Sequence, residues 1–131
     1  MRAAIPAFVA PISLALALAA CSSNQPPRTP PAMVPAGDPV SCVQTSQIRS
    51  TQVQDDQTID FTMRNGQVFR NTLPNRCPGL GFSRAFSYST STSQLCSVDI
   101  ITVIEQGGGP RRGASCGLGQ FVPVKPADAP K

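Results

Sequence analysis

The chain of 131 residues has no histidine and no tryptophan, and only 14% of its residues are charged. Because histidine is absent, a Ser-His-Asp triad is impossible, and the serines of residues 87–93 are not expected to act as nucleophiles. Zinc sites usually place paired ligands roughly two to four residues apart, whereas successive cysteines here lie about 20 to 35 residues apart. These absences predict a protein without a metal site or a cofactor.

Aromatic residues are also few, at 5% of the chain, and the formal net charge is +4. Proteins that bind single-stranded nucleic acid combine a basic groove with exposed aromatic rings. Here Phe82, Phe86, Tyr88 and Phe121 are expected to form the core of a domain that lacks tryptophan. We therefore expect no nucleic-acid partner.

The chain starts with a basic residue, Arg2, an apolar stretch over residues 3–18, and the tetrapeptide Leu-Ala-Ala-Cys that ends at Cys21. This order is typical of a secretory signal and resembles a bacterial lipoprotein signal. The resemblance implies that Cys21 is acylated and that Ser22 directs the protein to the outer membrane, facing the periplasm. An uncleaved membrane helix and a cleaved signal without lipid are the alternatives.

Composition divides the chain into four parts. After Cys21, proline recurs among small and polar residues, which favours an extended linker without enough apolar area to fold. The domain that follows is small enough to need disulfides for stability. The expected parts are a signal peptide at 1–20, a lipidated linker at 21–41, a β domain at 42–124 and a disordered tail at 125–131.

Short alternating patterns, without long helical periodicity, characterise the domain. Residues 59–63 alternate apolar and polar side chains, as in a half-buried strand. A three-residue loop at 64–66 places Phe61 opposite Phe69, whereas a two-residue turn would point Phe69 away from the apolar face. Gly66 supplies the left-handed residue that this loop requires.

The other segments expected to be strands are 42–53 (as one long or two short strands), 68–73, 84–89, 98–104 and 116–124. Residues 98–104 carry apolar side chains on both faces, which is typical of a central strand. About six short strands at intervals of roughly 8–12 residues predict an all-β fold, a small barrel-like or sandwich meander.

Apart from Cys21, four cysteines remain, and this even number predicts two disulfides formed in an oxidising compartment. A barrel-like closure would bring the first and last strands together, which favours Cys42–Cys116 with Cys77–Cys96. The sequence-local alternative is Cys42–Cys77 with Cys96–Cys116. Connectivity cannot be deduced from one sequence, so both pairings stay open.

Residues 107–113, with the sequence Gly-Gly-Gly-Pro-Arg-Arg-Gly, form the most site-like stretch. Glycine amides beside Arg111 and Arg112 suit an anionic group such as a phosphate or a carboxylate. The stretch lacks the terminal Gly-Lys-Ser/Thr of a P-loop, so a nucleotide is not expected. Secondary candidates for contact with a partner are Arg70, Arg76 and Arg84.

Asp55, Asp56 and Asp60 form the carboxylate cluster of the domain. Paired carboxyl groups hydrolyse glycosides when one is protonated and the other is ionised. However, aspartate also favours turns, which suits Asp55 and Asp56, and Asp60 falls on the polar face of a strand. Structural roles are therefore the preferred interpretation.

Four segments together resemble an uncharacterised family of small exported proteobacterial proteins, known only as a domain of unknown function. These segments are residues 56–61, 73–80, 95–101 and 115–123. The resemblance implies export to the envelope and a compact domain. It implies no activity and no catalytic residues.

We expect a non-enzymatic, lipid-anchored envelope protein whose β domain binds a periplasmic or cell-wall partner. That partner is a protein, peptidoglycan or lipopolysaccharide, and the membrane is contacted through the lipid on Cys21. One alternative is an inhibitor of a lysozyme-like or proteolytic hydrolase. A remote alternative is a hydrolase that depends on Asp55, Asp56 or Asp60.

Overall fold

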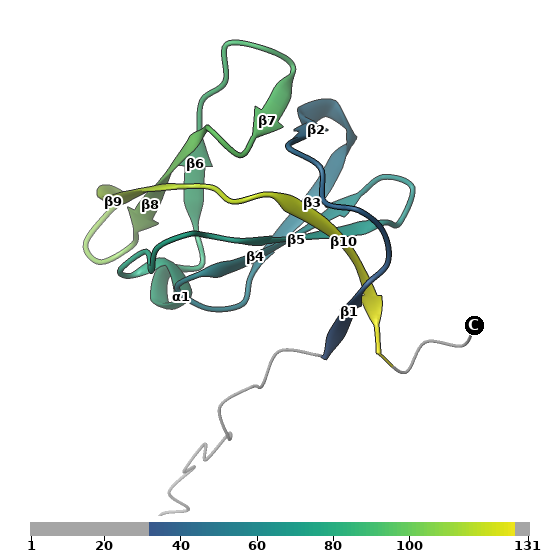
Figure 1. Cartoon of the computed structure of the whole chain (residues 1–131). Coiled ribbons are helices and arrows are strands. Elements are labelled where there is room, and N and C mark those ends of the chain that lie inside the picture. Colours follow the sequence, from purple (N-terminus) through teal and green to yellow (C-terminus); the bar gives the residue numbers. More distant parts are fainter. Residues whose placement is uncertain (1–31, 128–131) are drawn as a thin grey trace, which may run out of the picture.

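The computed structural model describes residues 32–127 (Figure 1). Within them the elements are β1 (Met33–Pro35), β2 (Cys42–Gln44), the short 3-10 helix η1 (Thr45–Gln47), β3 (Ile48–Val53), β4 (Thr58–Met63), β5 (Val68–Thr72), α1 (Leu80–Ser83), β6 (Phe86–Tyr88), β7 (Gln94–Cys96), β8 (Ile100–Glu105), β9 (Arg111–Gly117) and β10 (Phe121–Pro126). The expected signal peptide and Cys21 lie outside the described residues. In the described part, no helix is both long enough and apolar enough to cross a membrane.

The strands form three antiparallel sheets. The five-stranded sheet has the order β1-β10-β5-β4-β3, the three-stranded sheet has the order β6-β8-β9, and β2 pairs with β7. The two larger sheets face each other across the core, and the β2–β7 pair lies at the top of the view in Figure 1. The all-β prediction is confirmed, as a sandwich-like arrangement and not as a closed barrel.

The β4–β5 hairpin has the predicted register. Phe61 lies opposite Phe69, and Ile59 lies opposite Asn71. The Met63 amide donates a hydrogen bond of 2.8 Å to the carbonyl of Gln67, which leaves three residues in the loop. The last of them, glycine at position 66, has a φ of 88°, as the loop requires.

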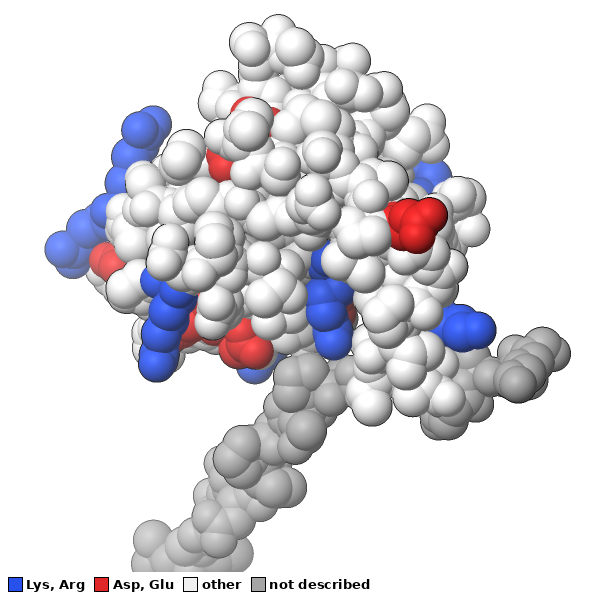
Figure 2. Space-filling model, in the orientation of Figure 1, with Lys and Arg blue, Asp and Glu red and all other residues white. Residues whose placement is uncertain are grey.

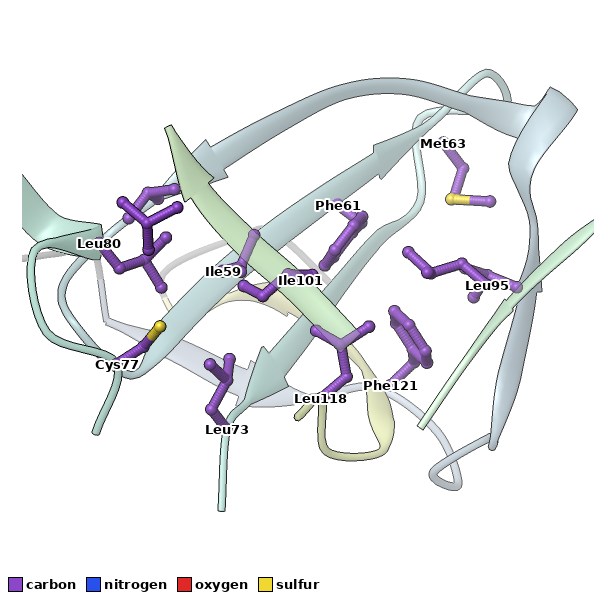
Figure 3. Packing of buried hydrophobic residues seen from close by; sticks show 13 residues of the cluster. Ile59, Phe61, Met63, Leu73, Cys77, Leu80, Leu95, Ile101, Leu118 and Phe121 are labelled. Carbon is purple, nitrogen blue, oxygen red and sulfur yellow. The ribbon is translucent and has the colours of Figure 1, made fainter. Parts of the chain in front are cut away.

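The core lies between the two larger sheets (Figure 3). Ile59 and Phe61 of β4 are fully buried, as is Ile101 of β8. The Phe61 ring stands edge-on to Phe121, with centroids 5.3 Å apart, and to Phe86, with centroids 6.3 Å apart. Because these rings come from both sheets, the aromatic cluster joins the layers, as predicted for Phe86 and Phe121.

The ends of the domain were predicted incorrectly. β1 lies within the expected linker, yet it pairs with β10, with Met33 opposite Pro126. Val40 also forms a bridge with Phe121 through two hydrogen bonds of 2.8 and 2.9 Å. A proline-rich segment already favours an extended backbone, so it can pair as an edge strand with the free side of β10.

Two further segments differ from their predicted form. Only Phe86–Tyr88 of residues 84–89 is a strand, because Arg84 ends α1 with a φ of 53°. β8 is central in its three-stranded sheet, but Val98 and Ile100 are 85% and 54% exposed. The segment 98–104 is therefore not buried on both faces.

Residues 116–124, predicted to be one strand, are divided between β9 and β10, which belong to different sheets. The division occurs around Gly119. The buried Asn71 amide group donates to the Gly119 carbonyl at 2.7 Å and accepts from its N–H at 2.9 Å. A Cβ at position 119 would collide with the Thr72 carbonyl oxygen, so only glycine fits this approach.

Both weighed disulfide pairings are wrong, because the bonds join Cys42 to Cys96 and Cys77 to Cys116. Cys42 and Cys96 lie directly opposite each other on β2 and β7. Cys116 lies on β9 in the three-stranded sheet, so it cannot close the first strand against the last. The prediction failed because it depended on residues 116–124 being one continuous strand.

Candidate functional site

The predicted site arginines fall into two groups, and Arg70 belongs to the first, which is paired within the fold. Its Nε donates to Asp60 Oδ1 at 2.8 Å and its Nη2 donates to Oδ2 at 2.9 Å. Gln54 also donates to Asp60 Oδ2 at 2.9 Å. The hydrogen bonds to Asp60 raise the pKa of Arg70 above its ordinary value. Asp60 points away from the core as expected but is only 6% exposed, so this pair is structural.

Arg76 is paired as well, with Asp56 at 2.7 Å. The Gly81 N–H donates to the other carboxylate oxygen of Asp56 at 2.8 Å. The Gly81 bond, and then Arg76, lower the pKa of Asp56 below its ordinary value of 3.8. A carboxyl group held in its charged form is the opposite of what a general acid requires. The geometry of Asp56 therefore suits fixing the turn at α1, and Asp55 accepts a turn bond of 2.8 Å from the Gln57 amide.

Arg111 and Arg112 belong to the second group, whose side chains form no salt bridge in the part of the chain that the structure describes. They open β9, with Arg111 opposite Glu105 and Arg112 opposite Ile104 on β8. Arg111 Nη2 donates to the Gly107 carbonyl at 3.0 Å. In residues 32–127 the salt bridges involve Arg70 and Arg76 and neither of these two side chains.

Arg84 also lies in this region and is without a salt bridge in the described chain. The next residue, Ala85, accepts a hydrogen bond of 2.9 Å from the Ile104 amide, which aligns it with the end of β8. Ala85 and Arg112 therefore lie on either side of Ile104, and because neighbouring strands lie about 4.8 Å apart, their backbones are about 10 Å apart. Arg84 thus ends the α1 turn while Arg111 and Arg112 open β9, and Arg76 lies beside the same turn, because Asp56 binds both Arg76 and the Gly81 N–H.

The turn at α1 lies beside the β8–β9 loop. Residues from both segments line one depression of about 500 Å³: Gly79, Phe82, Ser83, Glu105, Gln106 and Gly107. We call the combined region, residues 79–84 and 105–112, the loop end. Figure 2 shows Lys and Arg side chains projecting on the left of the molecule, where Figure 1 places the β8–β9 loop.

Phe82 is 94% exposed at the loop end, so its predicted place in the core is wrong. The cause is the single helical turn of α1, in which residues two positions apart point to nearly opposite sides. Leu80 takes the inward side and is fully buried, which leaves Phe82 facing solvent. Aromatic content could not reveal this, but the spacing between Leu80 and Phe82 on a short turn is a usable signal.

The loop end carries arginines and an exposed aromatic ring, together with the carboxylate of Glu105. Gly108 and Gly109 have φ values of 76° and 108°, so the loop follows a backbone path that favours glycine. Guanidinium groups recognise carboxylates and phosphates, and an exposed aromatic ring adds apolar contact area. Residues 32–127 contain no group of three or more Cys, Asp or Glu side chains arranged to hold a metal ion.

Comparison with known proteins identifies the family of the chain from its sequence. Searches of curated proteins and of solved structures each find no match. A family model described as a family of unknown function, DUF6491, matches residues 3–129. This match confirms the resemblance to an uncharacterised family, and because it spans nearly the whole sequence, the chain belongs to the DUF6491 family of unknown function.

Proposed function

We propose that this protein is a non-enzymatic, lipid-anchored protein of the bacterial envelope whose β domain binds an acidic partner through the loop end. The anchor is the acylated Cys21, and the site of action is the periplasmic side of the outer membrane. Two disulfides agree with an oxidising compartment.

One observation carries the proposal: the loop end combines an exposed aromatic side chain with arginines that form no salt bridge in the described residues. Phe82 is 94% exposed beside the β8–β9 loop. Aromatic and arginine side chains are the residues most enriched among those that dominate binding energy in protein interfaces. In the described chain, Arg84, Arg111 and Arg112 have no salt bridge, whereas Arg70 and Arg76 do.

A cross-linking pull-down from native envelopes tests the proposal. The full chain is tagged at Lys131, and captured components are identified by mass spectrometry. We expect one dominant protein partner, and we expect Arg111→Glu with Arg112→Glu to reduce its recovery at least tenfold, because both attractive charges become repulsive. Phe82→Ala should weaken the affinity for the purified partner by about 30-fold, a loss of about 2 kcal/mol typical of a central anchor.

The matched control is Arg49→Glu with Lys125→Glu, which changes the net charge equally on exposed positions of β3 and β10. Recovery with this control should equal that of the unchanged protein. If the loop-end variant captures as much partner as the control, the loop end is not the binding surface. Recovery of sacculus or lipopolysaccharide alone would replace the acidic protein partner with a structural envelope role.

Inhibition of a hostile hydrolase is the second candidate, favoured by the form of the α1 turn. Phe82 projects from a single helical turn that begins three residues after Cys77, whose disulfide to Cys116 holds the start of this segment. A protruding side chain on such a turn is suited to blocking an active-site cleft. The test is whether nanomolar protein slows a lysozyme or a protease, and whether Phe82→Ala removes that effect.

A further inference from the structure

β9 is an edge strand with one neighbour. Within residues 32–127 it pairs with β8, and the sheet order β6-β8-β9 leaves its other side without a strand. At seven residues, it is the longest strand of the described chain. An edge of this length presents unpaired backbone groups to which an extended chain can bind.

The backbone groups that face outward follow from the hydrogen-bond alternation of the β8–β9 pair. The Leu118 amide donates to the Asp99 carbonyl at 3.1 Å, so these residues form a hydrogen-bonded pair. In an antiparallel ladder, bonded and non-bonded pairs alternate. Ile100–Gly117 and Thr102–Ser115 are therefore non-bonded pairs, and the N–H and C=O of Ser115 and Gly117 point away from β8.

The β8–β6 pair leads independently to the same assignment of which β8 residues bond to β9. The Ile104 amide donates to Ala85 on the β6 side, so Thr102, two residues earlier, also directs its backbone groups toward β6. Thr102 therefore makes no ladder bond to β9, and its partner Ser115 is left facing outward.

Side chains leave this edge accessible. Gly113, Ala114 and Ser115 are small, and a Cβ placed at Gly117 would meet no atom within 4 Å. Cys116 is turned toward Cys77 by the disulfide. Residues 114–117 therefore present a backbone that small side chains leave open to an approaching strand. The Glu105 side chain lies against Gly113, and a β-bulge between Arg112 and Ser115 separates this open half from the arginines.

The arginines at the start of β9 indicate which side chains a strand added to its edge would have. Successive strand residues point to opposite faces, so Arg111 and Arg112 project on opposite sides of the sheet. A flat acidic surface reaches one of them, whereas an added strand places two consecutive side chains beside both. A second copy paired antiparallel would set Gly117 opposite Arg111 and leave both arginines without an acidic partner.

We propose that β9 binds an extended segment of a partner protein as an additional strand, with two consecutive acidic residues beside Arg111 and Arg112 and uncharged residues along 113–117. This proposal rests on the proposed function, since it specifies how the same arginines engage an acidic partner. Main-chain hydrogen bonds supply affinity, and the arginines set register and specificity.

The test uses the full chain and a blocked peptide, acetyl-Thr-Val-Thr-Val-Thr-Glu-Glu-amide, whose acidic end meets the arginines in an antiparallel pair. Binding is followed by fluorescence anisotropy and by hydrogen exchange of the Ser115 and Gly117 amides. We expect saturable binding that protects both amides, and at least tenfold weaker binding when the two glutamates are replaced by lysines. Absence of saturable binding would overturn the proposal.

A matched pair of variants separates backbone from side-chain recognition. Ser115→Pro removes the outward N–H without removing a bond to β8, whereas Ser115→Ala removes only the hydroxyl, which lies 3.1 Å from that of Thr102. We expect at least tenfold weaker peptide binding for the proline variant and less than a twofold change for the alanine variant. Equal binding by both variants would overturn strand addition.

A second measurement does not depend on the folding of the proline variant. N-methylation of the peptide amides that face β9 should abolish binding, whereas methylation at the alternate positions should not. If Arg111→Glu with Arg112→Glu lowers the recovery of the partner but Ser115→Pro does not, strand addition is wrong while the proposed function is supported. Dimers of the chain that Ser115→Pro dissociates would identify a second copy as the occupant and would also overturn the proposal.

Discussion

Two strands of this protein, β5 and β9, differ in how their arginines are bound. In the five-stranded sheet, Arg70 on β5 is held by both oxygens of the buried Asp60 carboxylate. At the end of the three-stranded sheet, the Arg111 side chain donates to a backbone carbonyl, and the Arg112 side chain has no hydrogen bond or salt bridge within the described residues. Arg70 thus serves the fold, whereas Arg111 and Arg112, like the exposed Arg49 on β3, form no salt bridge in the described residues.

This difference teaches that a basic residue is a poor guide to a site until its acidic neighbours are located. Asp60 faces Arg70 because β4 and β5 are paired in one register, and no comparable carboxylate contacts Arg112 in the described residues. Removing one partner of the Asp60–Arg70 pair should therefore lower the free energy of unfolding, whereas changes at the loop end should lower the affinity for a partner.

The largest effect is expected from the disulfide that joins the two sheets. Cys77 follows β5 and is fully buried, and its partner Cys116 lies on β9. Replacing both cysteines with alanine should lower the free energy of unfolding by about 3–4 kcal/mol, measured by urea denaturation. The matched double variant at Cys42 and Cys96 should lose about 2 kcal/mol, because that bond joins strands that are already paired.

The two disulfide variants together show which of the two disulfides contributes more to the free energy of unfolding. The sequence separations are similar, at 39 and 54 residues, so loop-closure entropy alone would make the two losses nearly equal. A larger loss for the Cys42–Cys96 variant would show that the β2–β7 pair, and not the Cys77 connection, holds the sandwich together.

A smaller effect is expected from Asp60→Asn. The change leaves the partly buried Arg70 guanidinium without its counter-charge, and we expect a loss of about 2–3 kcal/mol in the free energy of unfolding. The Arg111→Glu and Arg112→Glu variant is the contrast, with a change within about 0.5 kcal/mol, as for exposed surface positions. Equal losses in the two variants, by urea denaturation, would remove the distinction between the two strands.

The smallest effect concerns acid stability through Asp56. Its pKa is lowered in the folded state, so its stabilising contribution is present above the ordinary value of 3.8 and is lost as pH falls through the lower folded value. The melting temperature of Asp56→Asn should lie below that of the unchanged protein at pH 5, and the two should converge as pH falls below 3.8.

Asp38→Asn serves as the control for acid stability, since Asp38 is exposed. Its melting temperature should follow that of the unchanged protein throughout the acid range. A difference for Asp56→Asn that stays constant from pH 5 to the acid limit would show that the amide disturbs the α1 turn by packing and not by charge.

Local features were predictable from the sequence, as the β4–β5 hairpin demonstrates. The apolar alternation around Phe61 and the glycine at position 66 together specify one register, because a slip of one residue would expose every buried side chain. The involvement of the four domain cysteines in disulfides followed from their even number, but the pairing did not.

Features that depend on distant contacts were not predictable. Met33–Pro35 is a strand because β10 lies beside it, and nothing in its proline-rich composition indicates that neighbour. The break at Gly119 depends on Asn71, which lies 48 residues earlier. Such contacts join segments far apart in the sequence, so local patterns carry no record of them.

The sequence by itself determined the all-β class, the hairpin register and an arginine-bearing glycine loop, because each depends on residues within a few positions of one another. Tertiary structure alone decided which cysteines pair, which arginines are neutralised and which of Leu80 and Phe82 enters the core. Those outcomes depend on how the two sheets face each other, which places Arg70 beside a carboxylate and leaves Phe82, Arg111 and Arg112 at an open end.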